Sequence, residues 1–373
     1  MFHRWMAFLS RPAAPFLAAF ACLVVVLFAL SSIGFGRDEG QSFGHGVQKI
    51  ASVVLNRSVL PSPPSRRVLR DGESKPKESY RSWIQTLLAA TPILLTGLAV
   101  AVAFRASVLN IGAEGQYVMG AIAAVAIGLH PHGQPLLVIA TVLMAGFIAG
   151  AIFAGSAAVL QQYRGVPVVL STLLLNFVAA VLLKALLQGP LHEAGESLQS
   201  EQLPEIARLA HISLNERPTQ LHGGFFIAIA CAILISVIFR LSTFGFHLRA
   251  TGENPVATRF AGIRIGAISI ATLCLSGGLA GLAGAIQMSG LPPYLLLPDT
   301  ASSGFGFTGI AVALLGRLSP VGVVLSALFF GWLQTAFSAL ETELHVPFLT
   351  LQATQGGILI AILILTNLRR YKR

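Results

Sequence analysis

No charged residue occurs between Glu114 and Arg164. A helix needs about 20 mostly apolar residues to cross ~30 Å of hydrocarbon, because charged side chains and unpaired backbone groups are costly there. The stretch is long enough for two such helices, and the polar run at 130–135 (HPHGQP) divides it. This feature predicts a pair of membrane spans rather than part of a soluble fold.

Composition extends this conclusion to the whole chain. Charged residues make up 11% of the 373 residues, against ~25% in ordinary soluble domains, and the mean hydropathy is +0.75. So few charged side chains cannot cover a soluble surface, which excludes a conventional cytosolic enzyme, a nucleic-acid-binding domain and a disordered scaffold. We therefore expect an all-α, polytopic membrane protein, and we assign the net charge of +10 to cytoplasmic loops rather than to a nucleic-acid partner.

The apolar runs predict about ten transmembrane helices. They lie at 12–36, 82–104, 115–129, 136–163, 165–183, 222–239, 265–291, 303–316, 318–340 and 344–368. Ten spans place both termini on one side, and both ends of the chain are basic (MFHRWMAFLSR and LRRYKR). The chain then divides into a first span (1–36), an outer hydrophilic loop (37–81), the core (82–368) and a cytoplasmic tail (369–373).

Charge asymmetry supports placing both termini in the cytoplasm. The inner side then holds two acids, Glu114 and Glu253, beside a large set of basic residues: Arg4, Arg11, Arg105, Arg164, Arg240, Arg249, Arg259, Arg264, Arg317, Arg369, Arg370, Lys372 and Arg373. This agrees with the positive-inside rule. The basic loop 37–81 departs from the rule, and an alternative interpretation places a membrane-surface helix at 43–59. The first segment is interpreted as a retained span rather than a signal peptide, because its apolar run is long and no clean A-x-A site follows.

The first chemical motif is 104–116 (FRASVLNIGAEGQ), between two predicted spans. Arg105 ends one helix at the cytoplasmic face, and Asn110 can cap the next. Glu114 then lies in the first turn, where the helix dipole favours an anion. The alternative is functional, since an acid and an amide entering the bilayer edge also mark a moving or substrate-lining element.

The second motif is the long cytoplasmic connection 240–264. Asn254 followed by Pro255 predicts a helix N-cap and first residue, and Gly262 predicts the end of that helix. Val256 and Phe260 share one face of this two-turn helix with Ile263. Such a helix can dock onto a soluble partner or lie on lipid headgroups, and the residues alone leave both open.

The third motif is 302–317 (SSGFGFTGIAVALLGR), whose small residues allow close backbone approach. Phe305 and Phe307 offer aromatic faces for a base or sugar ring, although aromatic residues in membrane helices usually only pack. The sequence contains no nucleotide-binding loop, metalloprotease motif or nucleophile elbow. We therefore expect no enzyme activity, no cofactor and no metal. Uphill transport would draw its energy from a partner or an ion gradient.

Three segments together resemble the permease subunits of ATP-binding-cassette importers of the simple-sugar and nucleoside branch, especially the larger permease of bacterial nucleoside uptake systems. They are LLAATPILLTGLAVAVAFRASVLNIGAEGQYVMGA, LRATGENPVATRFAGI and GFGFTGIAVALLGRLSP, in that order, and the likeness covers most of 84–367. The resemblance implies a bacterial inner-membrane chain without ATPase activity. Its expected partners are cytoplasmic ATP-binding subunits, a second and often different permease, an extracytoplasmic substrate-binding protein, and membrane lipid.

The resemblance also assigns roles to residues. It implies coupling to the ATPase through Arg249, Thr251, Gly252, Glu253, Asn254, Pro255 and Arg259. It implies a translocation pathway or gate at Asn110, Glu114, Gln116, Asn176, Phe305 and Phe307.

The substrate stays open between classes of ring compound. Nucleoside members usually carry an Asn-Glu-Val-Ile-like run where this chain has 166–170 (VPVVL), so a simple sugar is the alternative to a nucleoside. An ion-coupled secondary transporter would need paired discontinuous helices and several embedded charges. Only Lys184 and Glu114 lie near span edges, which argues against it. A membrane-embedded enzyme would need His, Asp or Cys residues clustered within the spans, and the sequence shows no such cluster.

Overall fold

The computed structural model describes residues 19, 24–26, 43–58, 82–193, 195, 197–214, 217–298, 304–347 and 349–370. Within these residues the chain is helical apart from one β-hairpin. It divides into two compact units, one formed by Met1–Ala89 with Phe329–Arg373 and the other by Ala90–Leu328. All sequence-predicted site residues belong to the second unit.

The first unit contains helix α3 (Phe43–Ser58) and helix α15 (Leu349–Arg370). Ile50 and Val54, one turn apart on α3, are buried, whereas Ser52 between them is exposed. The helix anticipated by the alternative interpretation of 43–59 is therefore present, and its side of the membrane stays a prediction. The first predicted span, 12–36, lies outside the described residues except at 19 and 24–26.

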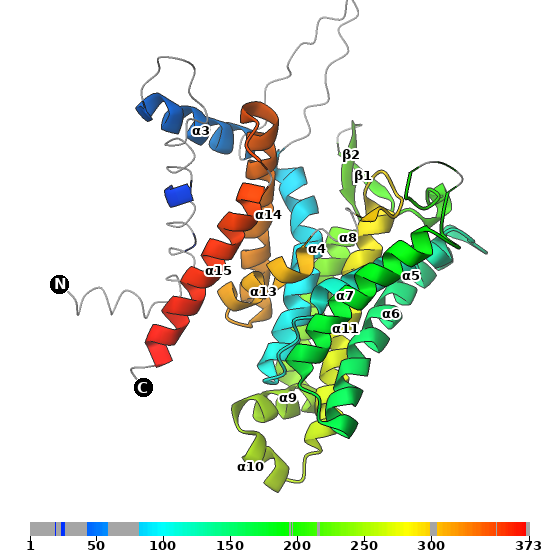
Figure 1. The fold of residues 1–373 in the computed structure, drawn as a ribbon, viewed down its shortest axis with the longest axis vertical. Helices are drawn as coiled ribbons and strands as arrows, with labels where there is room; N and C mark the ends of the chain where they lie inside the picture. The colour runs from blue at the N-terminus through cyan, green and yellow to red at the C-terminus, as the bar shows by residue number, and fades with distance from the viewer. Residues whose placement is uncertain are drawn as a thin grey trace, which may run out of the picture. The chain divides into compact units, whose positions relative to one another are not determined.

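Most predicted spans correspond to single helices (Figure 1). Their bounds are α4 (Ser82–Arg105), α5 (Ala113–Gly128), α6 (Pro135–Arg164), α7 (Val168–Leu187), α8 (Gly224–Leu241), α11 (Ile265–Gly290), α13 (Phe305–Leu315) and α14 (Pro320–Leu344). The division at HPHGQP is confirmed, because it separates α5 from α6. The predicted end of the 265–291 helix before two prolines is confirmed too.

The prediction of ten spans is not confirmed. Six described helices are long and apolar enough to cross a membrane, namely α4, α6, α7, α8, α11 and α14. Helices α5, with 16 residues, and α13, with 11, rise only about 24 and 17 Å, short of ~30 Å of hydrocarbon. Both helices are therefore shorter than a full span, and an apolar run alone does not reveal where such a helix begins.

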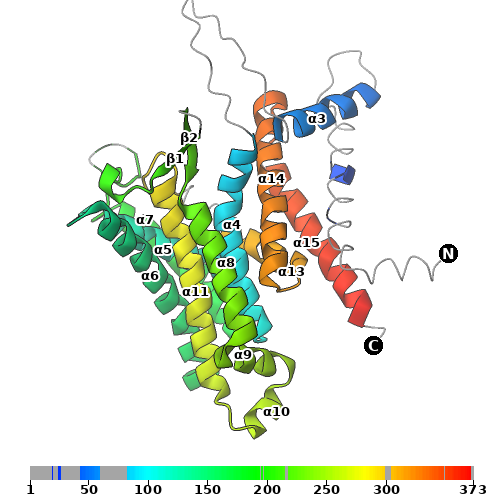
Figure 2. The same cartoon turned by 180° about the vertical axis from the view of Figure 1, so that it is seen from behind.

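Glycines hold the centre of the second unit together. Helix α11 packs against α5 and α6, and the three lie side by side in Figures 1 and 2. A Cβ atom on Gly281 would collide with the carbonyl oxygen of Gly146, and one on Gly120 would collide with Gly281 itself. Small residues therefore let these backbones touch, which is how membrane helices associate where apolar burial gives little driving force.

The two ends of helix α8 carry different structures (Figure 2). Before it, strands β1 (His211–Leu214) and β2 (Arg217–His222) form an antiparallel hairpin. Burial, with His211 nearby, lowers the pKa of His222 to about 4, so the neutral ring accepts a hydrogen bond from the Gly224 amide at Nδ1. After α8 come two short helices, α9 (Thr243–Glu253) and α10 (Pro255–Phe260).

Candidate functional site

The non-helical segment 106–112 between α4 and α5 turns back along α4, so that its later residues lie beside the apolar part of that helix. Asn110 is fully buried and donates from Nδ2 to Ser276 Oγ on α11, at 2.9 Å. Ser276 Oγ in turn donates to the carbonyl oxygen of Ala99, at 2.7 Å, which lies about 9 Å along α4 from Arg105. Irregular backbone at this depth is tolerated where protein surrounds it, as it does here.

Helix α7 fixes the same segment from another side. Asn176 donates from Nδ2 to the Ile111 carbonyl oxygen at 3.1 Å, and its Oδ1 accepts from the Gly115 amide at 2.8 Å. Thr172 Oγ1 accepts from the Ile111 amide at 3.3 Å. A single amide side chain thus holds the backbone on both sides of the start of α5.

The start of α5 corrects one sequence prediction. Gly112, not Asn110, occupies the N-cap position. Asn110 lies two residues earlier, where its Oδ1 accepts from the Gly112 amide at 2.9 Å and from Gln116 Nε2 at 3.0 Å. The prediction was wrong because the Asn110 side chain bonds to Ser276 and Gln116, contacts that local sequence does not show. The placement of Glu114 in the first turn is confirmed.

The Glu114 carboxylate caps a second helix as well as lying in the first turn of its own. It is 4% exposed, and it accepts hydrogen bonds from the amides of Gly304 at 2.9 Å and Gly306 at 2.7 Å. These amides belong to the N-terminus of α13, which has no side-chain cap of its own. Two helix N-termini therefore supply the positive end of their dipoles to one anion. No Lys or Arg in the described part of the chain forms an ion pair with it.

Helix α13 approaches α5 closely at this point. A Cβ atom on Gly306 would collide with the main chain of Glu114. Thr96 Oγ1 on α4 donates to the Phe305 carbonyl oxygen at 2.9 Å. We call the contact between Glu114 and the amides of Gly304 and Gly306 the helix-start junction.

The aromatic residues of α13 have different surroundings. Phe305 is buried and packs edge-on against Tyr117, with ring centroids 5.7 Å apart and an interplanar angle of 63°. Phe307 is 48% exposed. Only Phe307 of the two is therefore free to stack on a further ring.

Sequence reasoning missed Tyr117. It is fully buried one turn after Glu114, and its hydroxyl has no hydrogen-bond partner in the part of the chain that the structure describes. Buried hydroxyls are normally bonded, so this one is an exception beside the helix-start junction. Its i, i+3 relation to Glu114 is the signal that could have found it.

The connection after α8 matches its predicted local structure. Asn254 Oδ1 accepts from the Ala257 amide at 3.0 Å and Pro255 is the first residue of α10, as predicted. Gly262 follows the helix with φ +80°, the left-handed conformation that favours glycine at a helix end. Val256 is 63% exposed and Phe260 is 89% exposed, whereas Thr258 on the other face is buried.

The end of α9 lies against the end of α4. Ser107 Oγ donates to the Gly252 carbonyl oxygen at 2.8 Å, and a Cβ atom on Gly252 would collide with the Arg105 carbonyl oxygen. Thr251 is buried and bonds to the carbonyl oxygen of His247 in its own helix. Glu253 and Arg259 are exposed. The connection is thus attached directly to the residues that lead into segment 106–112.

The described residues contain no group of three or more His, Cys, Asp or Glu placed to hold a metal ion.

The chain matches one family model over residues 82–366, described as the branched-chain amino acid transport system / permease component. It belongs to this family. It is therefore the permease component of an ATP-binding-cassette transporter, a multi-pass membrane subunit that moves solute without an ATPase site of its own. Membership implies ATPase subunits and a binding protein as partners.

Individual relatives agree with this assignment. The permease is 34% identical over 291 residues to a guanosine ABC transporter permease of Bacillus subtilis, covering 75% of this chain and 79% of that one. It is 32% identical over 273 residues to a nucleoside ABC transporter permease of Lactococcus lactis, covering 71% and 74%. A glucose ABC transporter permease of Haloferax volcanii is 30% identical over 296 residues, covering 77% of each. No solved structure matches significantly.

Proposed function

We propose that the permease imports a nucleoside or a purine-like solute. The observation that carries this proposal is the similarity to permeases named for guanosine and for nucleosides over about three quarters of the chain. A simple sugar is the second candidate, because a permease named for glucose matches almost as well.

Uptake by whole cells separates the two solutes. The permease is expressed with the ATPase, second permease and binding protein encoded by neighbouring genes, and labelled guanosine and glucose are supplied separately. We expect ATP-dependent guanosine uptake that unlabelled adenosine inhibits and glucose does not. Glucose uptake without guanosine uptake would select the sugar function instead.

The proposed assembly has two different permeases above two ATPase subunits, in the bacterial cytoplasmic membrane. The cytoplasmic placement of both termini is supported by the basic residues at both chain ends. Single cysteines at Ser10 and Arg370 should react with a membrane-impermeant thiol reagent only after the cells are opened. Labelling of either cysteine in intact cells would place that terminus outside the cytoplasm.

Helices α9 and α10 are the proposed coupling segment. Val256 and Phe260 present an apolar surface that nothing in the described residues covers, as docking onto the ATPase requires. The contact of Gly252 with Arg105 and Ser107 offers a route from this surface to segment 106–112. A cysteine at Val256 should crosslink to the ATPase, and the absence of any such product would count against this role.

In the pathway we propose a division of tasks. Asn110, Gln116 and Asn176 hold the start of α5, and Glu114 joins it to α13. Phe307 is then the side chain that stacks on the solute ring, because aromatic faces attract planar rings and this one is half exposed. Phe307→Ala should raise KM for uptake about tenfold, while Phe177→Ala, which changes a more exposed aromatic side chain on α7, should not.

The ion-coupled alternative has one observation in its favour. Helices α5 and α13 are two short helices that meet at their N-termini, an arrangement also expected of secondary transporters. We nevertheless propose an ATP-driven permease. Glu114 is the only buried acid among the described residues, and backbone amides already bond to its carboxylate. Accumulation of solute by the purified chain in liposomes with an ion gradient and no ATPase would establish the alternative.

A further inference from the structure

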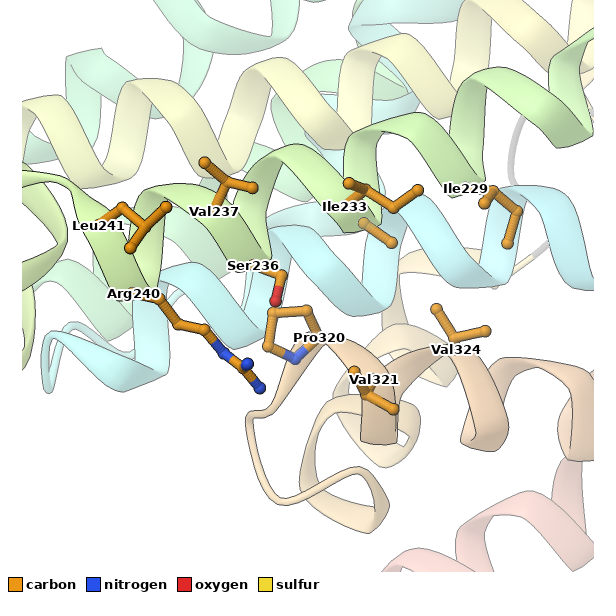
Figure 3. A pocket seen from close by; sticks show the side chains of 10 residues that line it. Ile229, Ile233, Ser236, Val237, Arg240, Leu241, Pro320, Val321 and Val324 are labelled. Atoms are coloured by element: carbon orange, nitrogen blue, oxygen red, sulfur yellow. The ribbon is translucent and has the colours of Figure 1, made fainter.

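An apolar groove lies between helix α8 and the first turns of α14. Ile229, Ile233 and Val237 line one wall, and Val321 and Val324 line the other, around a cavity of about 530 Å³. Figure 3 shows the side chains of both helices around the groove, with Ser236 of α8 next to Pro320 of α14. Such side chains suit a hydrocarbon chain and offer a polar solute nothing to bond.

One end of the groove is strongly basic. A second cavity, of about 710 Å³, adjoins it and shares Ser236, Arg240 and Pro320 with it. Four arginines from four different segments line this second cavity: Arg105, Arg240, Arg249 and Arg317. In Figure 3 the Arg240 side chain extends toward this end, past Pro320.

The arginines are only partly compensated. Arg105 donates to the Leu318 carbonyl oxygen at 3.0 Å and lies over the Phe239 ring at 5.4 Å. Glu253 attracts it, but Arg249 repels it, and no acid lines the cavity. Arg240, Arg249 and Arg317 form no ion pair within the described residues. Guanidinium groups that converge without acids bind phosphate strongly, because they donate paired, charge-assisted hydrogen bonds.

The size of the groove matches one leaflet of a bilayer. Arg240 lies in the last turn of α8, the end that leads into α9 and α10. Ile229 lies about 17 Å further along the helix, at 1.5 Å per residue. This distance is about half of the ~30 Å hydrocarbon thickness. The apolar wall therefore has the length of an acyl chain, and the basic cavity lies at headgroup level.

We propose that this groove binds one anionic phospholipid from the leaflet that faces α9 and α10, with its phosphate among the arginines and an acyl chain between α8 and α14. Charge complementarity identifies the occupant. A zwitterionic phospholipid adds no net negative charge, because its own cation offsets the phosphate, and a free phosphate leaves the groove empty. The proposed coupling route runs through the contact of Gly252 with Arg105 and Ser107, and Arg249 lies one helical turn before Gly252. Bound lipid would neutralise the cluster at that position.

Native mass spectrometry of the full chain in mild detergent tests the proposal. The probes are phosphatidylglycerol and phosphatidylcholine with identical acyl chains. The test variant is Arg240→Gln with Arg317→Gln, and the matched control is Arg164→Gln with Arg264→Gln, two exposed arginines outside the cluster. Each basic residue near a membrane surface contributes roughly fivefold to anionic-lipid binding. We therefore expect affinity for phosphatidylglycerol to fall about 30-fold in the test variant only.

A second variant tests the groove independently of charge. Ile233→Trp places a larger side chain in the groove and should reduce retention of phosphatidylglycerol, while its size-exclusion profile stays that of the parent. Three outcomes would overturn the proposal: equal retention of both lipids by the parent, equal loss in the control pair, or a second copy of the chain on the groove in place of lipid. The parent protein alone decides the first, so the proposal stays testable even if a variant fails to fold.

Discussion

The helix-start junction directly follows segment 106–112, and the exposed face of α10 follows α9, whose end lies against Arg105 and Ser107. The key side chains of the two regions nevertheless have opposite surroundings. At the junction, the Glu114 carboxylate is buried and bonded to two amides of α13. On α10, Val256 and Phe260 are exposed, and nothing in the part of the chain that the structure describes covers them. The bonds of the junction lie within one chain, whereas the α10 face is the surface that we propose docks onto the ATPase.

This difference predicts separate effects on the stability of the permease and on its proposed coupling to the ATPase. Changes at the junction should act on the isolated permease, because the bonds lost are its own. Changes on α10 should leave the isolated chain intact and act on transport. Four variants test this contrast, in order of their expected effect on the stability of the isolated chain.

Gly306→Leu should prevent folding. The new side chain collides with the main chain of Glu114, so overpacking, at about 1–3 kcal/mol, adds to the loss of two charge-assisted hydrogen bonds. We expect no monodisperse size-exclusion peak. Gly356→Leu, where a Cβ atom meets nothing within 4 Å, is the control. A normal peak for Gly306→Leu would mean that α13 does not need its close approach to α5.

Glu114→Ala should destabilise the chain by about 2–4 kcal/mol, because it leaves the amides of Gly304 and Gly306 buried without an acceptor. Glu114→Gln keeps one acceptor oxygen and should lie between Ala and the parent. The measurement is thermal unfolding in detergent, with Glu341→Ala at an exposed site of α14 as control. If Glu114→Ala melts with the parent, the carboxylate does not hold α13.

Asn254→Ala should cost about 1 kcal/mol locally, the usual value of an N-cap side chain. Because α10 contributes little to the core, the melting temperature of the chain should fall only slightly. Uptake should fall several-fold as α10 frays, and Asn254→Asp, which keeps the cap, should restore it. Equal uptake by the Ala and Asp variants would show that the cap is dispensable.

Phe260→Ser should leave thermal unfolding unchanged, since the side chain is 89% exposed. It should nevertheless abolish co-purification of the ATPase and most uptake, and Phe260→Leu should retain both. A drop in melting temperature without loss of ATPase binding would remove the contrast between the two regions.

Local signals were enough for α10 but not for the junction. Asn254, Pro255 and Gly262 are neighbours in sequence, so the cap, first residue and end of that helix could be predicted from them. Glu114 and Gly304 are 190 residues apart, so the sequence related Glu114 only to its own helix and assigned the cap to Asn110. The count of ten spans was not confirmed for a similar reason. Hydropathy marks α13 as apolar, but it does not show that this helix starts within the protein interior, beside Thr96.

The helix-start junction has a consequence for how selectivity can evolve. Glu114 binds main-chain amides, which every substitution on α13 preserves unless it replaces a glycine that permits the close approach. Phe307 can therefore be exchanged while the architecture around it is maintained. Under the proposed role of Phe307, the solute specificity of such a permease can change from one ring compound to another while the protein stays folded.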